Sequence, residues 1–184
     1  FFEAIGGGLN GPIMGSTTVN VNTNNKPIHG VYGGGYYAKV HKGTTVNITN
    51  ANMLGNVFGG GALGDIGKSD LDGEAGEESI ILNISGGTIA GSVYGANDIS
   101  GTVEGLVKMN ITGGTIQGNL FGAGNGDHIG YYTPDLCKYD VGENDNYYVV
   151  LHREPGAPTG KTYKGRPQTP AGVEMTLAGT DAEH

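Results

Sequence analysis

The fold is decided by residues 86–97, GGTIAGSVYGAN, which return at residues 113–124 as GGTIQGNLFGAG. Each copy follows a strand-like segment, so that four longer stretches align: VNVNTNNKPIHGVYGGG (19–35), VNITNANMLGNVFGGG (46–61), LNISGGTIAGSVYGAN (82–97) and MNITGGTIQGNLFGAG (109–124). All four read apolar-Asn-apolar, then a small polar turn, then an apolar residue, an aromatic and glycine. An internal repeat of this length predicts a fold built from stacked, similar units.

Two sets of equivalent residues give the register of the repeat. The apolar set, at successive spacings of 27, 36 and 27, comprises Val21, Ile48, Ile84 and Ile111. The aromatic set, at successive spacings of 26, 36 and 27, comprises Tyr32, Phe58, Tyr94 and Phe121. The single spacing of 36 is one repeat with about nine inserted residues, which we place in the acidic stretch 65–78.

Both ends of the sequence resemble half repeats. Residues 1–8, FFEAIGGG, match the back half of a unit, and residues 173–180, VEMTLAGT, match the front half. In the second match, Met175, Thr176 and Leu177 take the places of Met109, Asn110 and Ile111. Because a terminal unit without a neighbour is an open strand edge, we expect the parent chain to continue, or to be capped, on both sides.

Apolar and polar residues alternate within each unit, as in Val107-Lys108-Met109-Asn110-Ile111, and this period of two indicates strands. The unit is too short for a propeller blade, which needs about 40 residues. Short strands broken by glycine turns favour an all-β fold, a parallel β-solenoid with about 27 residues per coil. The coils fall near 1–15, 16–42, 43–78, 79–105, 106–171 and 172–184, with insertions at 65–78 and 125–171.

The glycines and aromatic residues then have expected structural roles. Gly86-Gly87 and Gly113-Gly114 mark corners that need positive φ, and Gly95 and Gly122 mark a second corner where a side chain would collide with the next coil. The aromatic residues Tyr32, Phe58, Tyr94 and Phe121 should form a stacked row.

Composition excludes several classes of function. The chain has 184 residues, 37 of them glycine, and a net charge of −8, which argues against a nucleic-acid partner because phosphate binding needs a basic patch. No apolar run reaches the roughly 18 residues that a membrane span requires. Cys137 is the only cysteine, so no internal disulfide can form.

One asparagine recurs at the same place in every unit and gives the most regular polar feature: Asn20, Asn47, Asn83 and Asn110. The side chains form either an outward array of amides that binds sugar hydroxyls or a structural ladder in which each amide bonds to the next. The last three also begin N-glycosylation motifs, which we interpret as a consequence of the repetition.

The insertion 65–78 is acidic. Asp70-Leu-Asp72-Gly resembles the start of a calcium loop, and with Asp65 it suggests the one cofactor that the sequence offers, Ca²⁺ held by Asp65, Asp70 and Asp72. The glutamate that completes a calcium loop is missing, so a solvated acidic loop is the competing interpretation.

The longer insertion, 125–171, holds six of the ten tyrosines. Residues 146–165 read as a β-hairpin with PGAPTG near its tip. Loops on a rigid scaffold are where binding usually occurs, so the candidate binding residues are Asp127, His128, Tyr131, Tyr132, His152 and Arg153. The competing interpretation is a hairpin that covers one face of the solenoid. The carboxylates in this segment have no spacing that defines a catalytic pair, and we assign no catalytic residue.

The phrases GGTIAGSVYGAND and ITGGTIQGNLFGAGNGD resemble the glycine-rich repeats of large secreted or surface-anchored bacterial adhesin-like proteins, within the pectin-lyase-like class of right-handed parallel β-helices. The resemblance covers residues 15–124, with echoes at 1–8 and 173–180. It implies right-handedness, an extracellular or cell-surface location, and a glycan or cell-surface protein as partner beside flanking repeats of the same parent chain.

Three functions follow as hypotheses. The first is a non-catalytic structural and adhesive module whose inserted loops contact a glycan or a protein. The second is a polysaccharide lyase or hydrolase, an activity that some β-helix proteins have, although no active-site motif matches. The third is a calcium-stabilised spacer.

Overall fold

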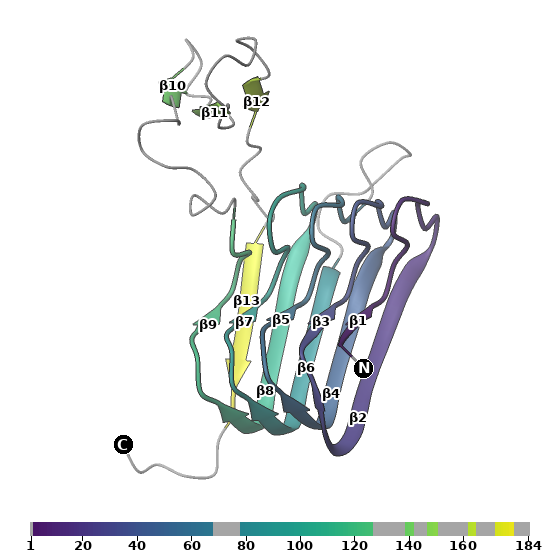
Figure 1. The fold of residues 1–184 in the computed structure, drawn as a ribbon, viewed down its shortest axis with the longest axis vertical. Coiled ribbons are helices and arrows are strands. Elements are labelled where there is room, and N and C mark those ends of the chain that lie inside the picture. The colour runs from purple at the N-terminus through teal and green to yellow at the C-terminus, as the bar shows by residue number, and fades with distance from the viewer. Residues whose placement is uncertain are drawn as a thin grey trace.

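The structure is a computed structural model that describes residues 2–67, 78–126 and 172–178, together with three strands between 139 and 164. Every regular element in these parts of the chain is a β-strand, so the all-β prediction is confirmed. The strands form two parallel sheets of five strands each and one antiparallel sheet of three (Figure 1). The described residues contain no helix of the length and apolarity that a membrane crossing needs.

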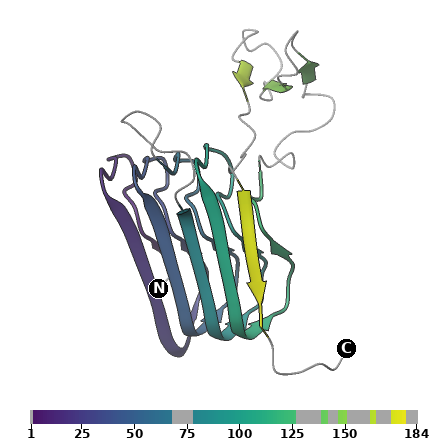
Figure 2. The same cartoon turned by 180° about the vertical axis from the view of Figure 1, so that it is seen from behind.

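Long strands make up one parallel sheet, here called the front sheet because it faces the viewer in Figure 2. Its members, in spatial order, are β13 (Gly172–Leu177), β8 (Leu106–Ile116), β6 (Glu78–Ile89), β4 (Gly43–Met53) and β2 (Ser16–Ile28). The view from behind shows these strands side by side with β2 and β13 at the two edges (Figure 2).

Short strands make up the other parallel sheet, the back sheet. Its order is β1 (Glu3–Ile5), β3 (Gly30–Tyr32), β5 (Val57–Phe58), β7 (Val93–Tyr94) and β9 (Leu120–Phe121). Each complete repeat gives one strand to each sheet, and we call this pair of strands a layer. A third row of parallel bridges links successive layers through Ile13, Val40, Ile66 and Val103.

The strand registers follow the repeat. Val21 pairs with Ile48, Ile48 with Ile84, and Ile84 with Ile111, as the sequence spacing predicts. The aromatic set is aligned in the same way in the back sheet. The half repeats also take their expected places, because β1 pairs with β3 and β13 pairs with β8, with Leu177 opposite Ile111.

Alternation along each strand separates a core from an outer face. In the front sheet Val46, Leu82 and Met109 point inward, and all three are fully buried. In the back sheet the inward residues Val31 and Val57 are equally buried. The hydrophobic core therefore lies between the two sheets and continues from layer to layer.

The glycine pairs differ from expectation in one respect. Gly87 and Gly114 have φ of 95° and 91°, as predicted, but Gly86 and Gly113 do not have positive φ, so that part of the prediction is wrong. Glycine is required at position 113 because the layers approach closely there. A Cβ atom on Gly113 would lie 2.6 Å from the carbonyl oxygen of Ser85 in the previous layer. Both pairs lie within a strand, β6 or β8, at the point where the register of these two strands shifts between Ser85 and Thr88.

Gly95 and Gly122 are likewise not positive-φ corners. They belong to a column of glycines that follow the aromatic residues, and at Gly33, Gly59 and Gly95 a Cβ atom would press on the backbone of the next layer. At Gly59, for example, a Cβ atom would meet the Gly95 carbonyl and would lie 2.6 Å from Cγ2 of Ile80. Close approach of the layers, the second role predicted for these glycines, is thus what requires them.

The antiparallel sheet comprises β10 (Tyr139–Val141), β11 (Tyr147–Val150) and β12 (Thr162–Lys164). Pairing of Val149 with Tyr163 places β11 against β12, which confirms the hairpin predicted over residues 146–165.

Candidate functional site

The outer face of the front sheet carries the asparagine column that the sequence singles out. Asn47 donates from Nδ2 to Oδ1 of Asn20 at 2.8 Å, Asn83 donates to Asn47 at 2.7 Å, and Asn110 donates to Asn83 at 2.8 Å. Thr176 continues the column, because it pairs with Asn110 in the strand register. We call these four asparagines the amide ladder.

The amide ladder is at once a structural element and a polar surface. A primary amide has two N–H donors and an oxygen with two lone pairs, and the ladder uses one donor and one lone pair of Asn47 and of Asn83. One donor and one acceptor site of each of these two amides therefore take no part in the ladder. The ladder interpretation is confirmed by these bonds, and the binding of sugar hydroxyls stays a prediction.

A neighbouring column on the same face changes in chemistry along the stack. Thr18, Thr45, Ile81, Lys108 and Glu174 are aligned by the strand registers. In this column β2 and β4 contribute neutral polar residues, whereas β8 and β13 contribute charged residues.

The back sheet carries a stack of aromatic rings on the side opposite its buried valines, where Phe58 is itself buried. Ring centroids of Tyr32 and Phe58 are 4.9 Å apart, those of Phe58 and Tyr94 are 5.0 Å apart, and those of Tyr94 and Phe121 are 4.9 Å apart. The interplanar angles are 14° or less. We call these four residues the ring column, and its spacing is that of neighbouring β-strands, about 4.8 Å.

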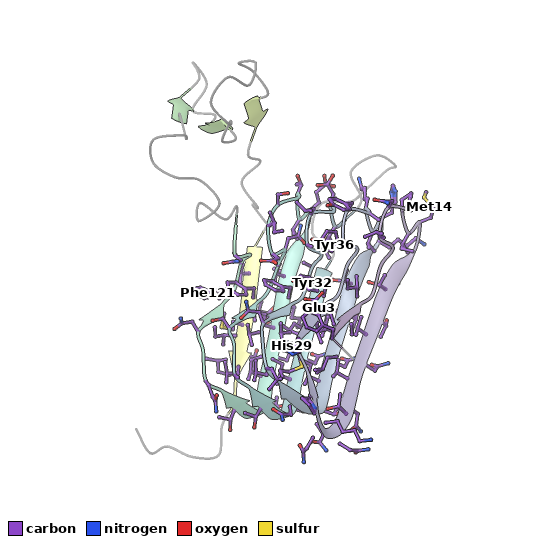
Figure 3. The ribbon with its side chains drawn as sticks, in the orientation of Figure 1. Glu3, Met14, His29, Tyr32, Tyr36 and Phe121 are labelled. Atoms are coloured by element: carbon purple, nitrogen blue, oxygen red, sulfur yellow. The ribbon has the colours of Figure 1, made fainter. Side chains whose placement is uncertain are left out.

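Tyr32, at one end of the ring column, is the most perturbed titratable side chain among the described residues. Its hydroxyl donates to Oδ2 of Asp98 at 3.2 Å. Burial, and then the negative charges of Asp98 and Glu3, raise the pKa of Tyr32 well above its usual value of about 10. Figure 3 shows Glu3, Tyr32 and Tyr36 on the same side of the molecule.

This shift argues against base catalysis at Tyr32. A tyrosine that removes a proton from a sugar ring needs a lowered pKa, because only the phenolate is a base. Here the neighbouring carboxylates stabilise the neutral phenol instead. The arrangement of Tyr32, Asp98 and Glu3 is that of a structural hydrogen bond beside two acidic groups.

Asp98 and its neighbour Asn97 belong to a loop whose role the sequence analysis missed. Asn97 is fully buried; its Oδ1 accepts from the backbone N–H of Gly61 at 2.8 Å, and its Nδ2 donates to the carbonyls of Gly64 and Ser100, each at 3.1 Å. Asp98 accepts from Nδ2 of Asn125 at 3.0 Å. The only sequence signal is polar residues after GA in the last two repeats, GAND and GAGN.

The predicted calcium residues are only partly described. Oδ1 of Asp65 accepts a hydrogen bond from the backbone N–H of Thr102 at 2.7 Å, which orders the loop of the next repeat. Asp70 and Asp72 lie outside the described residues. Within the described ranges, no three His, Cys, Asp or Glu side chains gather closely enough to hold a metal ion. The calcium site stays a prediction.

All six candidate binding residues of the long insertion lie outside the described residues, namely Asp127, His128, Tyr131, Tyr132, His152 and Arg153. The structure therefore does not test whether they share a surface.

Comparison with known proteins adds no assignment: no protein family, no curated protein and no solved structure matches the chain.

Proposed function

We propose that this chain is a non-catalytic structural and adhesive module of a larger secreted or cell-surface bacterial protein, built as a right-handed parallel β-helix. The glycan or protein contacts are made by the inserted segments 65–78 and 125–171. The observation that carries the proposal is the stacking of equivalent residues across five front-sheet strands.

A β-helix is supported by the order of the strands. The chain alternates between the front sheet and the back sheet, and a third row of bridges at Ile13, Val40, Ile66 and Val103 joins the layers at another position in the repeat. Right-handedness and the cell-surface location come from the resemblance of the glycine-rich repeat to those of adhesin-like proteins.

A structural role is supported by the way in which the layers hold together. Ladder hydrogen bonds, the ring column and the glycine column all connect one layer to the next, so stability accumulates with the number of layers. Such an element is stiff along the stacking axis and presents inserted segments at fixed positions, which is the usual way that scaffolds support binding loops.

Among the described residues, Tyr32 is the titratable side chain whose pKa is clearly shifted, and its surroundings do not favour a catalytic base. Asp98 accepts hydrogen bonds from Tyr32 and Asn125, and burial together with the charges of Asp98 and Glu3 raises the pKa of Tyr32, the opposite of what a phenolate base needs. Acid–base cleavage of a polysaccharide needs a group that can exchange a proton near neutral pH.

Two measurements test the proposal. The first is a glycan array probed with the 184-residue chain, paired with turnover assays on uronic-acid polymers and neutral glycans. We expect binding without turnover, and loss of binding in the variant Tyr131→Ala/Tyr132→Ala with unchanged unfolding. Turnover of any polymer overturns the non-catalytic role. Binding that survives removal of both tyrosines and of Arg153 overturns the assignment to the insertion.

The second measurement tests the fold. A duplicate of residues 85–111 inserted after Ile111 adds one full repeat, and we expect a folded protein that is longer by about 4.8 Å, as small-angle scattering can detect. A duplicate of residues 85–97 alone at the same place is the control, because a partial repeat breaks the register and should unfold the adjoining layers.

A further inference from the structure

Two adjacent residues, Asn97 and Asp98, make hydrogen bonds in both directions along the stack. They follow β7, which with β6 forms the third of the four complete layers; the first is β2 with β3, the second β4 with β5, and the fourth β8 with β9. Asn97 is fully buried and Asp98 is 9% exposed, so water competes little for their bonds. We call these two residues the clamp.

The clamp is bonded to both layers that precede it. Oδ2 of Asp98 accepts from the hydroxyl of Tyr32, in the first layer, at 3.2 Å. The side chain of Asn97 accepts from the N–H of Gly61 and donates to the carbonyl of Gly64, which both follow β5 of the second layer. The clamp therefore joins three layers before the fourth is considered.

The small residue at position 62 allows the clamp to reach the first layer. Asp98 donates its N–H to the carbonyl of Gly61, and this bond places Asp98 next to Ala62 of the second layer. Ala62 is buried and has only a methyl group. It therefore leaves room for the carboxylate of Asp98 to extend past the second layer to Tyr32.

The clamp is also bonded to the layer that follows it. Asn125 donates from Nδ2 to Oδ1 of Asp98 at 3.0 Å, and it donates its backbone N–H to the carbonyl of Asn97 at 3.0 Å. Asn125 comes after β9 of the fourth layer and is the first residue of the longer insertion, 125–171. One carboxylate thus accepts from the first layer at one oxygen and from the fourth layer at the other.

We infer that the carboxylate of Asp98 couples the start of the longer insertion, at Asn125, to Tyr32 in the first layer. A carboxylate bonded at both oxygens has a fixed orientation, so loss of the bond at one oxygen weakens the bond at the other. Opening of the chain at Asn125 then depends on a side chain three layers away. This inference needs only the hydrogen bonds above and is independent of the adhesive role.

The coupling has a consequence that does rest on the proposed function. If segment 125–171 makes the ligand contacts, a load applied to it is carried by all four layers rather than by the fourth alone. The experiments below measure the coupling without ligand, so they distinguish failure of the clamp from failure of the adhesive role.

Ordinary contact between layers does not produce such coupling. In a stacked fold each layer contacts its nearest neighbours. Tyr32 and Asn125 are three strand spacings apart, about 14 Å, and substitutions at that separation usually have independent effects. Because both side chains bond to one carboxylate, the effects of replacing them should depend on each other.

Hydrogen exchange of single amides, followed by NMR on the 184-residue chain, tests the coupling. The N–H of Asn125 reports opening at the start of the insertion. The N–H of Gly95 is the reference, because it donates to the carbonyl of Phe121 at 2.8 Å and so reports general separation of the third and fourth layers. In Tyr32→Phe we expect exchange at Asn125 to accelerate about fivefold and exchange at Gly95 to change by less than about twofold.

Tyr94→Phe is the matched control. It removes the same hydroxyl from the same ring column, and it does so one layer from Asn125 rather than three. Within the part of the chain that the structure describes, the hydroxyl of Tyr94 has no hydrogen bond to Asp98. Exchange at Asn125 should therefore keep the rate of the unmodified chain.

A double-mutant cycle gives an answer that does not depend on exchange. Urea denaturation gives the unfolding constants of Tyr32→Phe, Asn125→Ala and the double variant. The change in the double variant should be smaller than the product of the single changes by about threefold or more, because either substitution alone already frees the carboxylate. The same cycle with Tyr94→Phe in place of Tyr32→Phe should give the product.

Three results overturn the proposal. Equal acceleration at Asn125 and Gly95 in Tyr32→Phe, or no acceleration at either, means that the first layer does not control the start of the insertion. An equal acceleration at Asn125 in Tyr94→Phe assigns the effect to the ring column. Independent effects of Tyr32→Phe and Asn125→Ala show that the two oxygens of the carboxylate act separately.

Discussion

The hydroxyl of Tyr32 donates to the Oδ2 atom of Asp98 at 3.2 Å, across 66 residues of sequence. Tyr32 belongs to the first complete layer and Asp98 follows the strand of the third, so this bond spans the intervening layer of Phe58. The backbone at Asp98 is held against the preceding repeat, because Asp98 and Ile99 donate their N–H groups to the carbonyls of Gly61 and Ala62.

Stability should fall at alkaline pH in a way that depends on Tyr32. Its pKa is raised in the folded state, so the contribution of the neutral phenol is fully present below the unfolded pKa of about 10. The contribution is lost as pH rises beyond that value, because the unfolded state releases the proton first. Urea unfolding between pH 8 and 11 should show a steeper decline for the unmodified chain than for Tyr32→Phe. The exposed Tyr37→Phe is the control and should keep the original slope.

Replacing an asparagine in the interior of the amide ladder should destabilise the protein more than replacing one at its end. Asn83→Ala removes one hydrogen bond to Asn47 and one from Asn110, which should lower the free energy of unfolding by about 1 kcal/mol, since water can reach the freed groups. Asn20→Ala removes a single bond at the exposed end and should cost about 0.5 kcal/mol or less. Equal effects at the two positions, measured by urea unfolding, would contradict a cooperative ladder.

The glycine column should not tolerate a methyl group. In Gly59→Ala the new Cβ atom collides with the backbone of Gly95 and with Ile80, so the layers must separate locally, and we expect a loss of more than about 2 kcal/mol. Gly15→Ala adds the same atom where nothing lies within 4 Å and should change stability by less than about 0.5 kcal/mol. Thermal unfolding of the pair separates a steric effect from the general difference between glycine and alanine.

Asn97 should be the most costly polar residue to replace. Asn97→Ala leaves the N–H of Gly61 and the carbonyls of Gly64 and Ser100 without their side-chain partner in a buried place, which should lower the free energy of unfolding by about 3 kcal/mol. Asn119→Ala, at an exposed position, is the matched control. Hydrogen exchange should also accelerate at Gly61 in Asn97→Ala, and unchanged protection there would refute the assigned role.

Much of the architecture could be predicted because it is periodic. The spacing of Val21, Ile48, Ile84 and Ile111 specified which residues pair, and the strand registers have those partners. Even the half repeats at Ala4 and Met175 were assigned correctly from their resemblance to complete units. Periodicity makes such inference possible, since each unit contacts its neighbours in the same way.

The glycines show where local rules were insufficient. Sequence alone indicated that Gly86 and Gly113 share the positive φ of the residues that follow them, yet only Gly87 and Gly114 have it. A glycine needed for a turn and a glycine needed for close approach look identical in a sequence. The φ angles of the folded chain distinguish them, and the crowding of Gly113 by the Ser85 carbonyl exists only after the layers are stacked.

The sequence by itself determined the repeat, the parallel pairing and the columns of asparagines and rings, because equivalent residues one repeat apart must meet when similar strands stack. Only the tertiary structure decided the roles of Asn97 and Asp98, because the partners of their side chains, Gly61 and Tyr32, come from earlier layers. It also decided that Tyr32 is held as a neutral phenol, since that depends on burial and on the charges of Asp98 and Glu3, which come from distant parts of the chain.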